Sequence, residues 1–230
     1  MELNEIIYLI ITSLILIILA YLLLKKYFKK SINIKSKKSN YLERYSKLVN
    51  QFEKENKKFK YVDLIFMGDS LIFRYNIKQF FPEFTSLNRG IGGDTTFGLE
   101  KRLKVSCFDV KSKIVLMLIG INNIKTMFEN YENILIKLKN NINDRKIIIC
   151  SLTPMSKRNK KNNKFAVENN KKLKILAQKY DFIFLDLYKP LLDIKTNQII
   201  DTFTIDGLHF SFEGYKVITQ EIKNVLNKIL

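Results

Sequence analysis

The sequence predicts an α/β domain built on a parallel β-sheet, with a membrane-spanning helix in front of it. Short, nearly continuous apolar runs alternate with longer stretches of helical spacing from residue 61 onward. This alternation is typical of parallel strands that are buried under helices on both faces. A run of nineteen uncharged residues predicts the span. The 230 residues suffice for one domain of ordinary size and this additional segment.

The uncharged run, Ile6–Leu24, would extend roughly 28 Å as a helix, which matches the hydrocarbon core of a bilayer. A cleaved signal peptide is the alternative. It fits less well, because residues 1–5 carry two glutamates and no lysine, and no A-x-A-like site follows the run. We therefore predict a retained, single-pass membrane anchor with a basic flank at residues 1–30.

The net charge of +18 is densest directly after this run. Residues 25–60 hold thirteen Lys and Arg against three Glu, whereas residues 61–230 hold 27 against 17. By the positive-inside rule, this distribution favours a cytoplasmic domain whose flanking lysines face anionic lipid headgroups. The alternative is compositional, because lysine is frequent throughout and long domains can cross membranes regardless of charge. No nucleic-acid recognition motif accompanies the charge, so we expect no nucleic-acid partner.

Residues 31–60 are polar and rich in lysine, yet apolar side chains recur in them at helical spacing. The pattern predicts an amphipathic connecting helix that packs on the domain. A helix that lies on the membrane surface is the alternative. The apolar positions are Tyr41, Leu42, Tyr45, Leu48, Val49 and Phe52. The domain itself is then predicted to comprise residues 61–230.

Five strands and five helices are expected in the domain. In a covered parallel sheet, ligands bind beyond the carboxyl ends of the strands. Cys107 and Cys150 have no metal-ligand spacing and make no disulfide framework, so no metal site is predicted. The expected strands are residues 61–67, 84–88, 113–119, 146–150 and 182–187, and the expected helices are residues 71–80, 95–104, 127–142, 163–180 and 212–229.

Two segments offer a nucleophile and a base. Gly68-Asp69-Ser70 leaves the first strand for a helix, so the Ser70 hydroxyl would lie near free backbone N–H groups. His209 is the only histidine, and it follows Asp206 by three residues. Imidazole can take the proton of a serine hydroxyl near neutral pH, and a carboxylate can fix its tautomer. Taken singly, these residues are also explained as a helix cap and a surface loop.

Two further segments could stabilise an oxyanion. Residues 88–96 (NRGIGGDTT) follow the second strand, and their glycines let backbone N–H groups approach an oxygen closely. Residues 120–123 (GINN) follow the third strand, where a side-chain amide can donate to an oxyanion. The alternatives are a glycine-rich turn capped by Asp94 and a pair of helix-capping asparagines. A P-loop is excluded, because no G-x-x-x-x-G-K-[ST] is present.

In combination and in this order, the four segments resemble the SGNH/GDSL hydrolase family, and most closely its branch related to platelet-activating-factor acetylhydrolase. The resemblance covers about residues 62–226. It implies a flavodoxin-like, three-layer α/β/α sandwich with about five parallel strands. It also implies a serine esterase that acts on acyl esters without a metal or a cofactor.

The resemblance implies a role for each matching residue. Ser70 would be the nucleophile, His209 the general base and Asp206 the residue that orients His209. The oxyanion would be bound by the backbone N–H groups of Ser70 and Gly93 and by the side-chain amide of Asn122. Gly93 is chosen because the corresponding glycine of the family directly precedes an Asp-Thr pair.

Three neighbours of these residues are candidates for substrate binding, namely Arg89, Asp94 and Asn123. Asn123 departs from the family pattern, in which many members carry Asp or Glu at that position. Because the acetylhydrolase-like branch also tolerates Asn there, we expect the departure to affect the loop more than the chemistry.

The sequence is less informative about the substrate. No long apolar insertion predicts an acyl tunnel, so a short acyl group such as acetyl, carried by a lipid or an O-acylated glycan, is expected. The basic segment 156–164 could attract an anionic substrate, but a solvated loop in a basic chain explains it more simply. An acyltransferase with the same site is the first alternative. A non-catalytic binding protein is the second, and the complete Ser-Asp-His set argues against it.

Overall fold

The computed structural model describes residues 3–230, with side chains described from residue 39 onward and, before it, for residues 4, 8, 16 and 18–29. A first helix, α1 (Leu3–Asn56), runs up to the domain. The chain forms two compact units, Met1–Lys47 and Leu48–Leu230, so the last turns of α1 belong to the second unit. The backbone of most of residues 31–60, the predicted connecting helix, belongs to this same helix.

In the part of the chain that the structure describes, no helix combines the length and the apolar character needed to cross a membrane. Most side chains of the predicted span Ile6–Leu24 lie outside the described residues. The anchor at residues 1–30 therefore stays a prediction.

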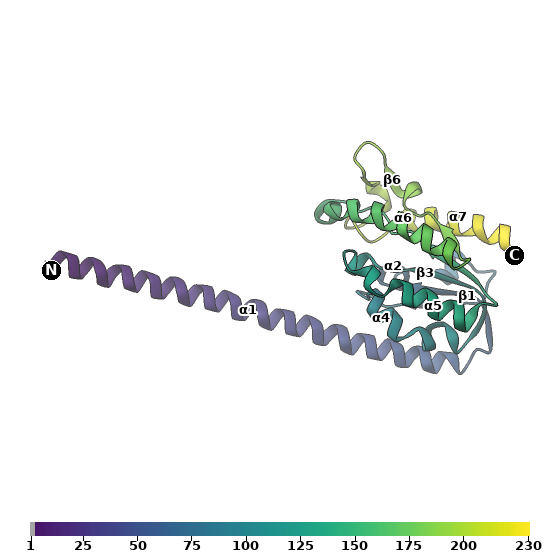
Figure 1. Ribbon diagram of the computed structural model, residues 1–230, viewed down its shortest axis with the longest axis horizontal. Helices are drawn as coiled ribbons and strands as arrows, with labels where there is room; N and C mark the ends of the chain where they lie inside the picture. Colours follow the sequence, from purple (N-terminus) through teal and green to yellow (C-terminus); the bar gives the residue numbers. More distant parts are fainter. Residues whose placement is uncertain (1–2) are drawn as a thin grey trace. The chain divides into compact units, whose positions relative to one another are not determined.

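The core of the second unit is a sheet of five parallel strands in the order β2-β1-β3-β4-β5, of which β1 and β3 are labelled in Figure 1. This confirms the predicted parallel sheet. Its inner strands are buried on both faces, which explains their nearly continuous apolar sequences. The register places Gly68 of β1 beside Gly90 of β2 and Leu118 of β3, so the segments that follow these strands start at the same edge. The strands are β1 (Tyr61–Gly68), β2 (Ser86–Gly90), β3 (Lys111–Leu118), β4 (Lys146–Cys150) and β5 (Ile183–Leu185).

Helices cover both faces of the sheet, so the domain has the three layers that were predicted. Ile65 and Met67 of β1 pack in one core with α4, α5 and α6, whereas Leu64 and Phe66 point into a second core with α2, α3 and α7. This alternation follows from the two-residue period of a strand. The helices are α2 (Ser70–Phe73), α3 (Ile77–Phe80), α4 (Thr96–Lys101), α5 (Tyr131–Ile142), α6 (Asn163–Lys179) and α7 (Phe212–Ile229).

Several short elements were not predicted. A π-helical turn, η1, follows α4, and a small antiparallel hairpin of β6 and β7 lies between β5 and α7. The remaining short turns are 3₁₀ helices. They are η2 (Ile121–Asn123), η3 (Met127–Glu129), η4 (Lys157–Asn162), η5 (Lys189–Leu191) and η6 (Asp201–Phe203), while η1 is Lys104–Phe108, β6 is Leu192–Asp193 and β7 is Gln198–Ile199.

The predicted helix at residues 71–80 is in fact two short helices, α2 and α3. The side-chain amide of Asn88 donates hydrogen bonds to the carbonyl groups of Ile72 (2.8 Å) and Tyr75 (3.1 Å). These carbonyls are thereby satisfied without a continuing helix. The break depends on a residue from the neighbouring strand, so local spacing does not reveal it.

Candidate active site

The candidate nucleophile is held where β1 meets α2. Asp69 caps α2, since its carboxylate accepts a hydrogen bond from the backbone N–H of Leu71 (3.0 Å). Ser70 is the first residue of the helix and is 8% exposed. Gly68 precedes this turn at a crowded position, because a Cβ atom there would lie 2.2 Å from the Leu118 carbonyl oxygen. The small residue lets β3 approach closely while the chain turns into α2.

The predicted Ser-His-Asp residues are brought together by the fold. The Nε2 atom of His209 lies 3.0 Å from the Ser70 hydroxyl oxygen, across 139 residues of sequence. The Nδ1 atom of His209 lies 2.7 Å from a carboxylate oxygen of Asp206. This is the geometry of a nucleophile, a base and a residue that orients the base.

Asp206 and His209 form a compact turn. The second carboxylate oxygen of Asp206 accepts hydrogen bonds from the backbone N–H groups of Leu208 (3.0 Å) and His209 (2.8 Å). Burial acts against the ionisation of Asp206, but the hydrogen bonds from His209 and Leu208 outweigh it and lower its pKa to about 2. The residue is therefore a carboxylate at neutral pH. Gly207, with a φ of 88°, takes the left-handed conformation that the turn requires.

Thr204 supports this turn and was not predicted. Its hydroxyl donates to the His209 carbonyl (2.9 Å) and accepts from the Gly207 N–H (2.9 Å). The Ile205 N–H also donates to the His209 carbonyl (3.0 Å). A threonine two residues before Asp206 gives no signal in the sequence, because its role depends on the shape of the turn.

The candidate oxyanion donors Gly93 and Asn122 lie on neighbouring loops. The side-chain amide of Asn122 donates to the carbonyl of Asp94 (2.8 Å), which joins the loop after β3 to the loop after β2. Both Gly93 and Asn122 are exposed, and Gly93 has a left-handed φ of 81°. Within the described residues, the second N–H of the Asn122 amide has no protein partner. A substrate oxygen could therefore be bound by it.

The structure corrects the prediction that Arg89 binds substrate. Its side chain is fully buried and points toward the last turns of α1. The guanidinium pairs with Glu55, donates to the Asn56 side chain (2.6 Å) and lies 4.6 Å from the centre of the Phe52 ring. Burial lowers the pKa of Arg89, and the contact with Glu55 acts in the opposite direction. Arg89 thus fastens the end of α1 to the sheet.

Asp94 and Asn123 are also occupied within the protein. Asp94 is buried, and one carboxylate oxygen lies 2.9 Å from the Nε atom of Arg102. Asn123 donates to the Thr96 hydroxyl (2.8 Å) and accepts from the Thr96 N–H (3.3 Å). Both side chains shape the loops that carry Gly93 and Asn122. The burial of Asp94 corrects the prediction that it binds substrate, whereas for Asn123, which is only partly buried, substrate binding stays a prediction.

Arg102 is the main residue of this region that sequence reasoning missed. Its buried guanidinium donates to Asp94 and to the carbonyls of Gly68 (2.9 Å) and Arg89 (2.8 Å). It also donates to the Ser106 hydroxyl (2.9 Å). One side chain thereby joins the ends of β1 and β2 to the loop that contains Gly93. The sequence does contain one indication of this role. Arg102 shares the apolar face of a helix with Leu99 and Leu103, and an arginine buried on such a face requires hydrogen-bonding or charged partners.

The carboxyl group of Asp69 lies in this same buried region. Burial raises its pKa to about 7, and the nearby Asp94 adds to this effect, while the Leu71 N–H and Arg102 act against it. The buried region next to Ser70 thus contains the carboxyl groups of Asp69 and Asp94 and the guanidinium of Arg102.

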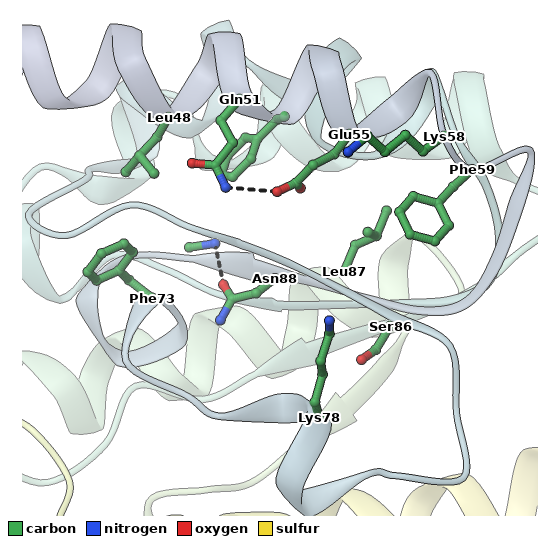
Figure 2. A pocket seen from close by; sticks show the side chains of 12 residues that line it. Leu48, Gln51, Glu55, Lys58, Phe59, Phe73, Lys78, Ser86, Leu87 and Asn88 are labelled. Carbon is green, nitrogen blue, oxygen red and sulfur yellow. Dashed lines mark hydrogen bonds between the residues drawn. The ribbon is translucent and has the colours of Figure 1, made fainter.

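A hollow of about 440 Å³ lies away from the candidate catalytic residues, between the last turns of α1, β2 and α3 (Figure 2). Its lining includes none of Ser70, Asp206 and His209. Polar groups in it are already paired, as the Gln51–Glu55 hydrogen bond (2.8 Å) and the Asn88–Gly90 hydrogen bond (2.9 Å) show. We assign it no role in the chemistry.

Comparison with known proteins finds the family that the four segments resemble. The profile of the GDSL-like lipase/acylhydrolase family matches residues 66–217. The alpha2 subunit of platelet-activating factor acetylhydrolase IB from Rattus norvegicus is 29% identical over 191 residues, which cover 75% of this chain and 80% of that protein.

Solved structures share the fold. A candidate platelet activating factor from Streptococcus pneumonia has a TM-score of 0.78 and 23% identity, and the alignment covers 85% of this chain and 99% of that chain. A catalytic variant of an acetylxylan esterase from Geobacillus stearothermophilus has a TM-score of 0.59 and 15% identity, with 71% and 93% covered. At these identities the likeness establishes the common α/β architecture.

Proposed function

Because this chain belongs to the GDSL-like lipase/acylhydrolase family, it is a carboxylic ester hydrolase, and we propose that Ser70, His209 and Asp206 carry out its chemistry. The observation behind this assignment is the continuous path from the Ser70 hydroxyl through both ring nitrogens of His209 to the Asp206 carboxylate. His209 is the only histidine of the chain, so no second imidazole competes for the role of base.

In the proposed mechanism, the Ser70 oxygen attacks the ester carbonyl while Nε2 of His209 takes the serine proton. The Asp206 carboxylate holds the Nδ1–H of His209 and stabilises the imidazolium that forms. The imidazolium then protonates the leaving alcohol. Water releases the acyl group from Ser70 by the same steps in reverse, with His209 again acting as the base.

The tetrahedral oxyanion would be bound by the N–H groups of Ser70 and Gly93 and by the Asn122 amide. In other enzymes, removal of one such donor raises the activation barrier by about 3–4 kcal/mol. The hydrogen bond from Asn122 to the Asp94 carbonyl keeps this amide beside the Gly93 loop before substrate arrives. Little rearrangement is then required when the charge develops.

We propose that the acyl group transferred to Ser70 is short, such as acetyl. Two similar proteins are named for acetyl esters, one an acetylhydrolase and the other an acetylxylan esterase. The first name refers to a lipid and the second to a glycan, so both carriers stay within the proposal. We further propose that the uncharged run Ile6–Leu24 anchors the chain in a membrane, with the catalytic domain in the cytoplasm.

The test uses the full chain in detergent, with a fluorophosphonate probe and with p-nitrophenyl acetate. Wild type should be labelled and should turn over the ester, and Ser70→Ala should lose both activities. Ser86→Ala, a matched serine on β2, should keep both. A folded wild type that is neither labelled nor active would refute the assignment, as would labelling that survives in Ser70→Ala. Acyl transfer to an added sugar in preference to water would identify the reaction as a transfer.

A further inference from the structure

A cluster of exposed cations lies beside the turn that holds His209. The helix η4 presents Lys157, Arg158, Lys160 and Lys161 to solvent, and the turn between β6 and β7 presents Lys195. In the described part of the chain, none of these five side chains forms an ion pair. Their charge is therefore available to an external partner.

Two hydrogen bonds make these segments one surface next to the candidate site. The Ser156 N–H, directly before η4, donates to the carbonyl of Gly207 (2.8 Å), which lies between Asp206 and His209. The side-chain amide of Asn163, directly after η4, donates to the carbonyl of Asn197 in the β6–β7 turn (2.8 Å). The segments that carry the cations are thus fixed relative to the turn that carries His209.

Apolar side chains are exposed on the same segments. Ile194, in the β6–β7 turn, is 83% exposed, and Ile205, directly before Asp206, is 56% exposed. The acidic neighbour Asp193 is engaged with the Lys195 N–H (2.8 Å) and the Thr196 hydroxyl (3.0 Å), and Asp201 is exposed in η6. We call the five cations together with Ile194 and Ile205 the basic face.

The composition of the chain does not by itself explain this face. Lys157 adopts a left-handed backbone with a φ of 53°, a conformation that favours Gly or Asn over a residue with a long side chain. Exposed isoleucines add nothing to a merely solvated loop. Cations mixed with exposed apolar side chains are instead the pattern of surfaces that bind at the boundary between headgroups and acyl chains.

We propose that the basic face docks the catalytic domain on an anionic phospholipid surface, and that its ester substrate is taken from that surface. The substrate part rests on the proposed esterase function, whereas the docking part does not. A lipid surface is favoured over an acidic glycan because Ile194 and Ile205 would gain from an apolar phase, which a hydrated sugar does not supply.

Docking can be observed directly, because the chain contains no tryptophan. Full-length Ile194→Trp would be reconstituted in vesicles of phosphatidylcholine, alone or with about one third phosphatidylserine. We expect its fluorescence to shift to shorter wavelength only in the vesicles with phosphatidylserine. Ile175→Trp, at another well-exposed position on α6 (63%), should not shift in either vesicle.

Matched charge reversals test whether the cations are responsible. One variant changes Lys157, Lys160 and Lys161 to Glu in the Ile194→Trp background. The control changes Lys60, Lys111 and Lys146, exposed residues at the opposite, amino-terminal edge of the sheet, in the same way. Only the first variant should lose the shift. Its turnover of a vesicle-borne, short-acyl phospholipid, relative to that of p-nitrophenyl acetate, should fall roughly tenfold or more.

The outcomes separate this proposal from the proposed function. An unshifted Ile194→Trp in anionic vesicles, equal shifts in both vesicles, or equal losses in the two triple variants would each overturn docking by the basic face. A response to a soluble acidic glycan in place of vesicles would also overturn it. A normal shift in a protein that does not hydrolyse p-nitrophenyl acetate would refute the esterase assignment and leave the docking surface in place.

Discussion

The two halves of the candidate site are built in different ways. Ser70 and the Gly93 loop rest on strand ends that the buried side chain of Arg102 ties together. His209 and Asp206 belong to an accessible turn, held mainly by hydrogen bonds among Thr204 and the residues up to His209. We infer that substitutions in the half around Ser70 lower both the stability and the activity of the protein. Substitutions in the half around His209 should lower the activity with little effect on stability.

Removing the imidazole should have the largest effect of all and should be confined to activity. We expect His209→Ala to lower kcat roughly ten-thousandfold or more, because no other histidine can take the Ser70 proton. The free energy of unfolding should fall by about 1 kcal/mol or less, since the His209 side chain is partly exposed (16%) and Asp206 keeps its two backbone hydrogen bonds. Ester turnover and urea unfolding measure the two quantities. A loss of several kcal/mol would remove the contrast between the halves.

Removing the guanidinium of Arg102 should lower both the free energy of unfolding and the ester turnover. Arg102→Met removes the buried ion pair with Asp94, so we expect the free energy of unfolding to fall by about 3–5 kcal/mol. In the folded fraction, kcat should fall more than KM rises, because the Gly93 loop and the Ser70 strand end lose their common support. Arg158→Met, on exposed η4, is the control and should change stability by less than about 0.5 kcal/mol. Equal stability of the two variants would contradict the proposed role.

The smallest expected effect sharpens the comparison through pH. Burial raises the pKa of Asp69 to about 7. The carboxyl group of Asp69 therefore binds its proton more tightly in the folded protein than in the unfolded chain. The contribution of Asp69 to stability is therefore fully present below about pH 4 and is lost as the pH rises through about 7. Asp206, with its pKa lowered to about 2, behaves in the opposite way, and its contribution is lost only as the pH falls from about 4 through about 2.

Asp69→Asn should therefore reduce the loss of stability between pH 5 and pH 8, by on the order of 2–3 kcal/mol. The amide keeps the oxygen that accepts from the Leu71 N–H but does not titrate. Asp193→Asn, at the surface, should leave the pH dependence as it is in wild type. Urea unfolding at the two pH values provides the test, and an unchanged slope in Asp69→Asn would show that Asp69 does not titrate in this range.

Much of the fold was accessible from local sequence. The strands were recognisable because a strand buried on both faces must be apolar along its length, and β4 was predicted at its observed bounds. The second strand was placed two residues early, at 84–88, because its ends depend on pairing with β1 and not on its own residues. The hairpin of β6 and β7 is too short to produce a recognisable alternation.

Among the site residues, those with a proposed role in the chemistry were recognisable by type and by their position at strand ends or before the last helix. The supporting residues were not. Arg89 lies in the glycine-rich segment, yet its side chain is bound by Glu55, 34 residues away. Arg102 contacts carbonyls of two strands, and nothing in the residues around it indicates which ones.

The sequence by itself determined the parallel α/β architecture, the family and the set Ser70, Asp206 and His209, because burial patterns and reactive side chains are properties of short segments. Only the tertiary structure decided which polar residues face substrate and which support the loops. It turned Arg89 and Asp94 inward, bound the Asn123 side chain to Thr96, and joined η4 to the turn of His209. Such choices depend on contacts between segments that are distant in the chain, and a hydrogen bond across the sheet leaves no periodic pattern in the sequence.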